Sequence, residues 1–309
     1  MLTFFIKRLL GMIPILWVII TASFFVMRLT PGGPFDAEKA VSKEIRKNLE
    51  AKYKMNLPLW QQYFSYLVDV AQGDLGPSFQ NKDYTVNEII AQTLPVSLEL
   101  GWYAMIFATA TGIFLGILAA LYRNRFPDYL TSGISIAGLS IPSMVLGPVC
   151  VIIFAIYWHV LPTSGWDSWQ TKILPTFTLG LAQLAIISRL MRAGMLDVLS
   201  QGFIRTARSK GLKERVVIWR HCLRAAILPV MSYLGPAIAF VVTGSVVVEQ
   251  IFSIPGMGRY FVISALNRDY TVVLGVSIVL SAFVLFLNLW VDMMYFWLDP
   301  RIRMGKKHA

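Results

Sequence analysis

The sequence contains few of the residues from which disulfide frameworks and metal centres are built. Only two cysteines occur in 309 residues, and Cys150 lies inside an apolar run while Cys222 lies in a basic one. The three histidines, His159, His221 and His308, are far apart and show no metal-ligand spacing. We therefore expect neither a disulfide-stabilised secreted domain nor a metal enzyme.

Nucleotide-binding and catalytic motifs are also absent from the sequence. There is no GxxxxGK(S/T) loop, because Gly305-Lys306 lacks a glycine at the required upstream position. HExxH, GxSxG and a dinucleotide-binding glycine run do not occur either. We therefore expect a chain that is not an enzyme, does not hydrolyse ATP itself and has no cofactor of its own.

Charged residues are scarce and apolar residues abundant. Only 15% of the residues are charged, 56% are apolar, and the mean hydropathy is +0.61. This composition is typical of a polytopic membrane protein. The net charge of +11 does not indicate a nucleic-acid-binding protein, because the bases lie in short segments between apolar runs.

Six apolar runs are long enough to cross a bilayer core of about 30 Å, which takes about 20 helical residues. They cover residues 9–27, 101–122, 133–158, 173–190, 228–248 and 271–295. Pro142 and Pro148 interrupt the third run, and this part should face other helices or a cavity, since lipid cannot satisfy the freed backbone groups. The sequence thus predicts an all-α integral membrane protein with six transmembrane helices.

The distribution of bases predicts the orientation of these helices. Of the 28 lysines and arginines, 17 fall in the N-terminus, the loops after the second and fourth runs, and the C-terminal tail, if Arg189 at the end of the fourth run is counted with its loop. By the positive-inside rule, both termini are then cytoplasmic. The long hydrophilic region after the first run has a near-neutral charge and a helical pattern at residues 37–55, which permits export. We expect three parts: an N-terminal transmembrane helix (1–30), an extracytoplasmic helical region (31–98) and a five-helix core (99–309) with a cytoplasmic loop (193–227).

Residues 201–229 form the most basic stretch between two apolar runs, with seven bases and one acid. Phe203, Ala207 and Gly211 recur every four residues, which places them on one helical face, and Gly211 is a helix stop signal. A second amphipathic run follows. Its apolar positions are Val216, Trp219, Leu223 and Ile227, and Arg220 and Arg224 lie on the opposite side.

This pattern predicts a helix, a glycine break and a second helix on the cytoplasmic surface, where another protein docks. The alternative interpretation is an ordinary cytoplasmic loop that is basic only because of the membrane topology. Composition does not separate the two interpretations, but the order of the residues favours docking.

The order of residues in this stretch resembles a known motif. RTARSKG, nine further residues, HCLR and then ILPV are similar to the EAA loop of binding-protein-dependent ABC importer permeases, in the form seen in the dipeptide/oligopeptide branch. Arg205, Thr206 and Ala207 take the Glu-Ala-Ala positions and Gly211 takes the glycine. His221, Leu223 and Arg224 take the Ile, Leu and Pro positions. FFIKRLLGMIPILWVI, MRLTPGGPF, GDLGPSF, IPSMVLGP and ALNRDY extend the resemblance to the B-type permease subunit of oligopeptide importers.

This resemblance implies a type I ABC importer permease fold in the inner membrane, with a coupling helix that sits in a cleft of an ATPase. It implies a second permease subunit, two ATPase subunits that bind ATP and Mg, an extracytoplasmic peptide-binding protein, and oligopeptides as cargo. The residues that it assigns to ATPase coupling are Phe203, Arg205, Thr206, Ala207, Arg208, Lys210, Gly211, Leu212, His221, Leu223 and Arg224. The substrate pathway is not identified.

Several alternatives remain open. Permeases of the same family for dipeptides, nickel, haem or antimicrobial peptides are poorly separated by sequence. A secondary transporter without an ATPase would be favoured by an ionisable residue in mid-span. Glu99, Glu249 and Asp292 instead lie near span ends, where we expect water to reach them. A membrane enzyme ranks third, because no catalytic constellation is present.

Overall fold

The computed structural model describes residues 2–29, 56–81 and 83–298. The helical pattern expected at residues 37–55 and the basic C-terminal tail lie outside these residues. Within the described part the regular elements are helices, and the extended backbone is limited to an isolated bridge between Pro77 and Thr85. The chain forms two compact units, residues 1–96 with 255–289 (the first unit) and residues 97–254 with 290–309 (the second unit).

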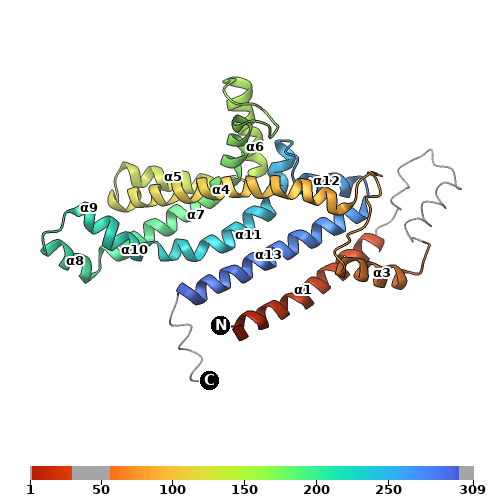
Figure 1. Cartoon of the computed structure of the whole chain (residues 1–309). Coiled ribbons are helices and arrows are strands. Elements are labelled where there is room, and N and C mark those ends of the chain that lie inside the picture. Colours follow the sequence, from red (N-terminus) through yellow and green to blue (C-terminus); the bar gives the residue numbers. More distant parts are fainter. Residues whose placement is uncertain (1, 30–55, 82, 299–309) are drawn as a thin grey trace. The chain divides into compact units, whose positions relative to one another are not determined.

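The first unit consists of helices from both ends of the chain (Figure 1). They are α1 (Leu2–Leu29), α3 (Leu59–Ala71), the start of α4 (Val86–Leu121), α12 (Met257–Leu266) and most of α13 (Tyr270–Leu298). Its core joins Ile20 of α1, Val86 and Ile89 of α4 and Val276 of α13. Gly275 allows α4 and α13 to approach closely, because the Val86 side chain occupies the space that a Cβ atom at Gly275 would need.

The second unit is built around α7 (Trp169–Leu199). Its other helical elements are the rest of α4, α5 (Phe126–Ser140), α6 (Ser143–Cys150), the π-helix η1 (Val151–Tyr157), α8 (Gly202–Ser209), α9 (Glu214–Val216), the π-helix η2 (Val217–Cys222), α10 (Leu223–Ala226) and α11 (Leu228–Ile251). Helices α5, α10 and α11 pack against α7. A Cβ atom at Gly116 of α4 would lie 2.6 Å from the Ser188 carbonyl oxygen of α7. Small residues thus bring α4 onto α7, as they do in many membrane helix pairs.

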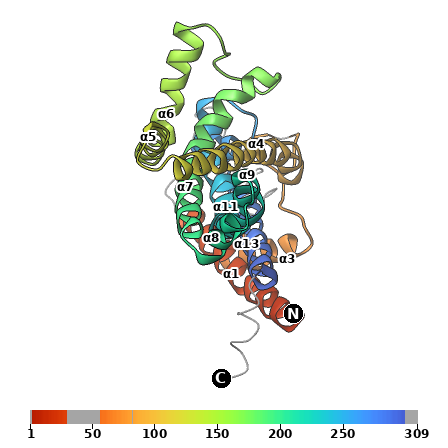
Figure 2. The same ribbon diagram turned by 90° about the vertical axis from the view of Figure 1, so that its left-hand side faces the viewer.

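The apolar runs predicted from the sequence correspond to helices, with one correction. Four helices are long and apolar enough to span a membrane, and the number rises to six if each of two bent pairs is one span. The third run is broken, as its prolines predict: the α5 axis and the axis of α6 with η1 differ by 110° at the break between Ser140 and Ser143 (Figure 2). The second run begins earlier than predicted, because α4 starts at Val86. Its 36 residues give a length of about 54 Å, more than a bilayer core requires.

Candidate functional site

The stretch from residue 201 to residue 227 lies at one end of the second unit, where α7 ends and α11 begins (Figure 1). Its first helix, α8, is held by two buried side chains, Ile204 and Ala207, which join a hydrophobic cluster that includes Met195 and Val198 of α7. Burying a side chain such as Ile204 stabilises the folded state by about 2 kcal/mol. Phe203 faces outward and is 46% exposed. The helix is therefore anchored on one side, and its opposite side is free for contact.

Gly211 ends this helix, as the sequence predicts. Its φ is +74°, a left-handed conformation that glycine adopts without steric cost, and its N–H donates to the Arg208 carbonyl oxygen over 2.9 Å. A Cβ atom added at Gly211 would meet nothing within 4 Å. Glycine is thus required by the backbone conformation and not by crowding.

The second helix of the stretch differs from the prediction. The sequence pattern places Val216, Trp219, Leu223 and Ile227 on one face, but Trp219 is 58% exposed. The buried residues are Val217, Cys222 and Ala226 instead. The cause is the π-helix η2, whose wider turn separates Val217 from Cys222 by five residues and so shifts the buried face.

The second helix is anchored on α7 by close contacts. The Cys222 Sγ atom lies 3.6 Å from the Met195 Sδ atom. The backbone of Ala226 passes so near Gly194 that a Cβ atom there would collide with the Ala226 carbonyl oxygen. Both halves of the stretch are therefore attached to α7.

One ion pair bridges the glycine break. The Arg208 guanidinium donates to Glu214 through Nη2, at 2.6 Å from Oε1, and through Nε, at 3.1 Å from Oε2. These hydrogen bonds hold the pKa of Glu214 below its ordinary value. Both side chains are well exposed, so the pair orients the two halves of the stretch more than it stabilises them.

The predicted coupling residues mostly lie on the surface. Ala207 is buried, His221 and Leu223 are half-buried, and the exposed members are Phe203, Arg205, Thr206, Arg208, Lys210, Gly211, Leu212 and Arg224. Among the described residues, the Arg208–Glu214 contact is the one ion pair that any of these bases makes. The predicted coupling residues thus expose both cationic side chains and two apolar ones, Phe203 and Leu212.

Three polar sites were not identified from the sequence. Asp128 of α5 receives a bidentate contact from Arg192 of α7, with N–O distances of 2.6 and 2.7 Å. Asp269, which is 1% exposed, accepts hydrogen bonds from the Ser78 hydroxyl and from the backbone N–H groups of Phe79 and Gln80. These partners are far apart in the sequence, so no local pattern shows them.

The third site corrects the expectation for Glu249, which the sequence places within reach of water. Its side chain is fully buried in the second unit and accepts a hydrogen bond from the Ser245 hydroxyl at 2.8 Å. Glu99 is 35% exposed, in agreement with the expectation, and its partners are the Lys172 ammonium at 2.6 Å and the Trp166 indole N–H at 2.9 Å. The Asp292 side chain is outside the described part of the structure.

These features define a class of protein: a polytopic helical membrane protein whose glycine-broken basic loop is anchored on the transmembrane helices, as in a transporter permease. The chain belongs to the family of inner membrane components of binding-protein-dependent transport systems. Residues 112–304 match that family, and residues 1–101 match its N-terminal membrane component.

Similar proteins agree with this assignment. The chain is 48% identical, over 98% of its length and all of the relative, to the oligopeptide transport system permease protein OppB of Haemophilus influenzae, and equally to that of Escherichia coli strain K12. It is 41% identical, over 99% of its length and all of the relative, to the dipeptide transport system permease protein DppB of Bacillus subtilis. The solved structure of an amino acid ABC transporter with histidines has a TM-score of 0.55 at 15% identity, covering 67% of this chain and 93% of that one. This likeness shows that the fold is shared.

Proposed function

We propose that this chain is the permease subunit of an ABC importer that moves oligopeptides across the inner membrane. The similarity to oligopeptide permeases over nearly the full chain supports oligopeptides as the cargo. The observation that carries the mechanism is α8, which is anchored to α7 by Ile204 and Ala207 and presents Phe203 and several bases outward. ATP and Mg belong to two separate ATPase subunits, and a second permease subunit and an extracytoplasmic peptide-binding protein complete the complex.

In the proposed orientation both termini and the loop of residues 193–227 face the cytoplasm. Residues 31–98 form the extracytoplasmic region, residues 1–30 the first transmembrane helix, and residues 99–309 the permease core. The concentration of lysine and arginine in the assigned cytoplasmic segments supports this orientation. The binding protein then docks on the extracytoplasmic loops.

The proposed mechanism is mechanical. Closure of the ATPase pair around ATP moves α8, and the buried contacts of Ile204, Cys222 and Ala226 pass that movement to α7. The helices around α7 then alternate between an outward-open and an inward-open arrangement. In this mechanism the coupling residues act by position and not by chemistry.

Reconstitution tests this proposal. Proteoliposomes that contain this chain, the second permease subunit, both ATPases and the binding protein should accumulate a labelled pentapeptide only with ATP and Mg. Omission of either ATPase should stop uptake. Uptake that persists without ATPase and follows an ion gradient would instead show a secondary transporter.

Competition assays in the same proteoliposomes define the cargo. Unlabelled pentapeptide should compete with labelled pentapeptide far better than dipeptide, nickel, haem or a cationic antimicrobial peptide does. Stronger competition by dipeptide would assign the chain to a dipeptide importer, and the similarity to the Bacillus subtilis protein makes this the principal alternative.

A further inference from the structure

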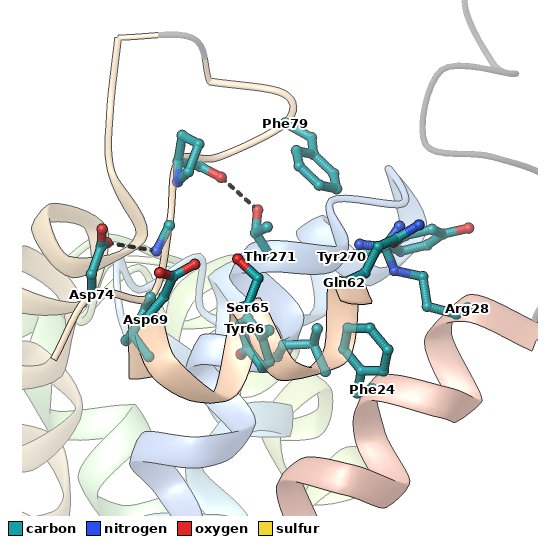
Figure 3. Close-up of a pocket in the computed structure, with 14 residues that line it drawn as sticks. Phe24, Arg28, Gln62, Ser65, Tyr66, Asp69, Asp74, Phe79, Tyr270 and Thr271 are labelled. Atoms are coloured by element: carbon teal, nitrogen blue, oxygen red, sulfur yellow. Dashed lines mark hydrogen bonds between the residues drawn. The ribbon is translucent and has the colours of Figure 1, made fainter. Parts of the chain in front are cut away.

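The first unit contains a cavity of about 270 Å³ (Figure 3). It lies where α1 ends, beside α3, the turn before α4 and the start of α13. Its lining consists of Phe24, Arg28, Gln62, Ser65, Tyr66, Asp69, Asp74, Leu75, Gly76, Pro77, Phe79, Tyr270, Thr271 and Leu274. The volume is just below the range of drug-sized pockets, so a ligand here is small.

Opposite charges stand on opposite sides of this cavity. In Figure 3, Asp69 and Asp74 lie on one side, Arg28 lies on the other, and Ser65 and Tyr66 of α3 lie between them. Asp74 accepts the Gly76 N–H at 2.9 Å through one oxygen, Oδ1. The arrangement therefore presents an anionic end and a cationic end to whatever enters.

Two hydrogen-bond donors of residues that line the cavity, Arg28 Nε and Tyr66 Oη, are buried without a partner in the described part of the chain. A buried donor that lacks a partner costs about 1–3 kcal/mol, so such groups are rare and call for a ligand, an ion or water. Burial raises the pKa of Tyr66, so its hydroxyl keeps its proton and remains a donor. The cationic side of the cavity therefore also holds two buried donors.

The apolar part of the wall holds the polar atoms in place. The Tyr66 ring stacks on the Phe24 ring with centroids 5.8 Å apart, and the Arg28 guanidinium carbon lies 5.4 Å from the same Phe24 centroid. Phe24 is 1% exposed. The Arg28 guanidinium and the Tyr66 ring are therefore both held by contacts with one buried ring.

We propose that this cavity is a binding site for a small zwitterion of the size of a dipeptide or smaller. The carboxylate of the ligand contacts the Arg28 guanidinium, and its ammonium group contacts Asp69 and Asp74. The site goes beyond the transport function proposed above, and it stands whether or not α8 docks on an ATPase.

Calorimetric titration of the full chain in lipid nanodiscs tests this site without any ATPase. Alanyl-alanine should bind, and the two blocked forms, N-acetyl-alanyl-alanine and alanyl-alanine amide, should each bind at least about tenfold more weakly, because each leaves one charged wall unpaired. This arm uses the unaltered protein, so it does not depend on the folding of any variant.

Variants place the binding in the cavity. Arg28→Gln and Asp69→Asn should each weaken alanyl-alanine binding at least about tenfold, and Asp83→Asn, an exposed acid outside the cavity, should leave it unchanged. No heat of binding at millimolar dipeptide would overturn the proposal. It would also be overturned by equal affinity for the blocked forms, or by full affinity in variants that elute as the unaltered protein does, since the dipeptide would then bind elsewhere.

Discussion

The basic stretch at residues 201–227 and the turn around Asp269 differ in the burial of their charged side chains. Asp269 is buried in the first unit, and the Ser78 hydroxyl and the backbone N–H groups of Phe79, Gln80 and Val272 donate to its carboxylate. The basic stretch in the second unit exposes most of its bases to solvent. A buried carboxylate with many donors fixes a turn, whereas exposed cations are available to a partner.

This difference predicts which substitutions should affect stability and which should affect transport. Removing Asp269 leaves several buried donors without an acceptor, so we expect the free energy of unfolding to fall. Altering the outer side of α8 removes nothing from the buried cluster of Ile204 and Ala207, so we expect ATP-driven uptake to fall while stability is kept. The following predictions test this division, from the largest expected effect to the smallest.

The largest effect should come from Gly211. Gly211→Val places a β-branched residue at a φ of +74°. The left-handed conformation costs ordinary residues about 1–2 kcal/mol, and β-branched residues rarely adopt it. We expect ATP-driven peptide uptake in proteoliposomes to fall at least tenfold, with an unchanged amount of protein in the membrane.

Two controls accompany this variant. Gly211→Asn should keep most of the uptake, because asparagine tolerates the left-handed region, and Gly202→Ala should keep all of it, since Gly202 has open space around it and no positive φ. Normal uptake by the valine variant would remove the requirement for a helix end at this position.

Asp269→Ala should give the largest loss of stability. The Ser78 hydroxyl and the N–H groups of Phe79 and Gln80 lose their acceptor, at a combined cost of about 2–4 kcal/mol. The free energy of unfolding, measured by circular dichroism during titration with SDS in mixed micelles, should fall by this amount. Asp83→Asn serves as the matched acid control, and equal effects of the two substitutions would contradict the anchoring role.

Asp128→Asn should have an intermediate effect on stability. The substitution removes the charge that holds Arg192 by two short contacts, while Asp128 itself is 4% exposed. We expect the free energy of unfolding to fall by about 1–3 kcal/mol in the same assay. Asp197→Asn, at an exposed position of α7, should change the free energy of unfolding by less than about 0.5 kcal/mol. If Asp128→Asn were as mild as this control, the link between α5 and α7 would be weak.

Glu214→Gln should have the smallest effect. The exposed pair with Arg208 contributes less than about 0.5 kcal/mol, and 1 M salt should abolish the contribution. Because the pKa of Glu214 is lowered in the folded state, the contribution is complete above the unfolded pKa and is lost as pH falls through the folded pKa. Unfolding at pH 7 in low and high salt measures it, and a salt-independent loss above 1 kcal/mol would show a buried interaction.

Local signals in the sequence were sufficient for much of the fold and part of the site. The six apolar runs, the break before Pro142 and the helix end at Gly211 each depend on neighbouring residues, and each is present in the structure. The rest depends on tertiary structure. The π-helix η2 changes the helical period inside an element, so a regular spacing wrongly placed Trp219 on the buried face.

Long-range contacts explain the other differences. Asp269 and Ser78 are separated by 191 positions, and no periodicity relates them. Glu249 lies at the end of an apolar run, which suggests contact with water, yet packing in the second unit buries it completely. The cavity near Arg28 combines residues from three distant segments, so it too is visible only once these segments are folded together.

A photo-crosslinking residue at position 203 in the assembled complex gives the most direct test of the docking surface. Phe203 is exposed on α8 beside the anchoring residues, and Tyr84, exposed in the first unit, provides the control position. The account predicts an adduct between position 203 and an ATPase subunit, with a yield that changes when ATP is added, and no such adduct from position 84. An absence of ATPase adducts from position 203, in a complex that still takes up peptide, would contradict it.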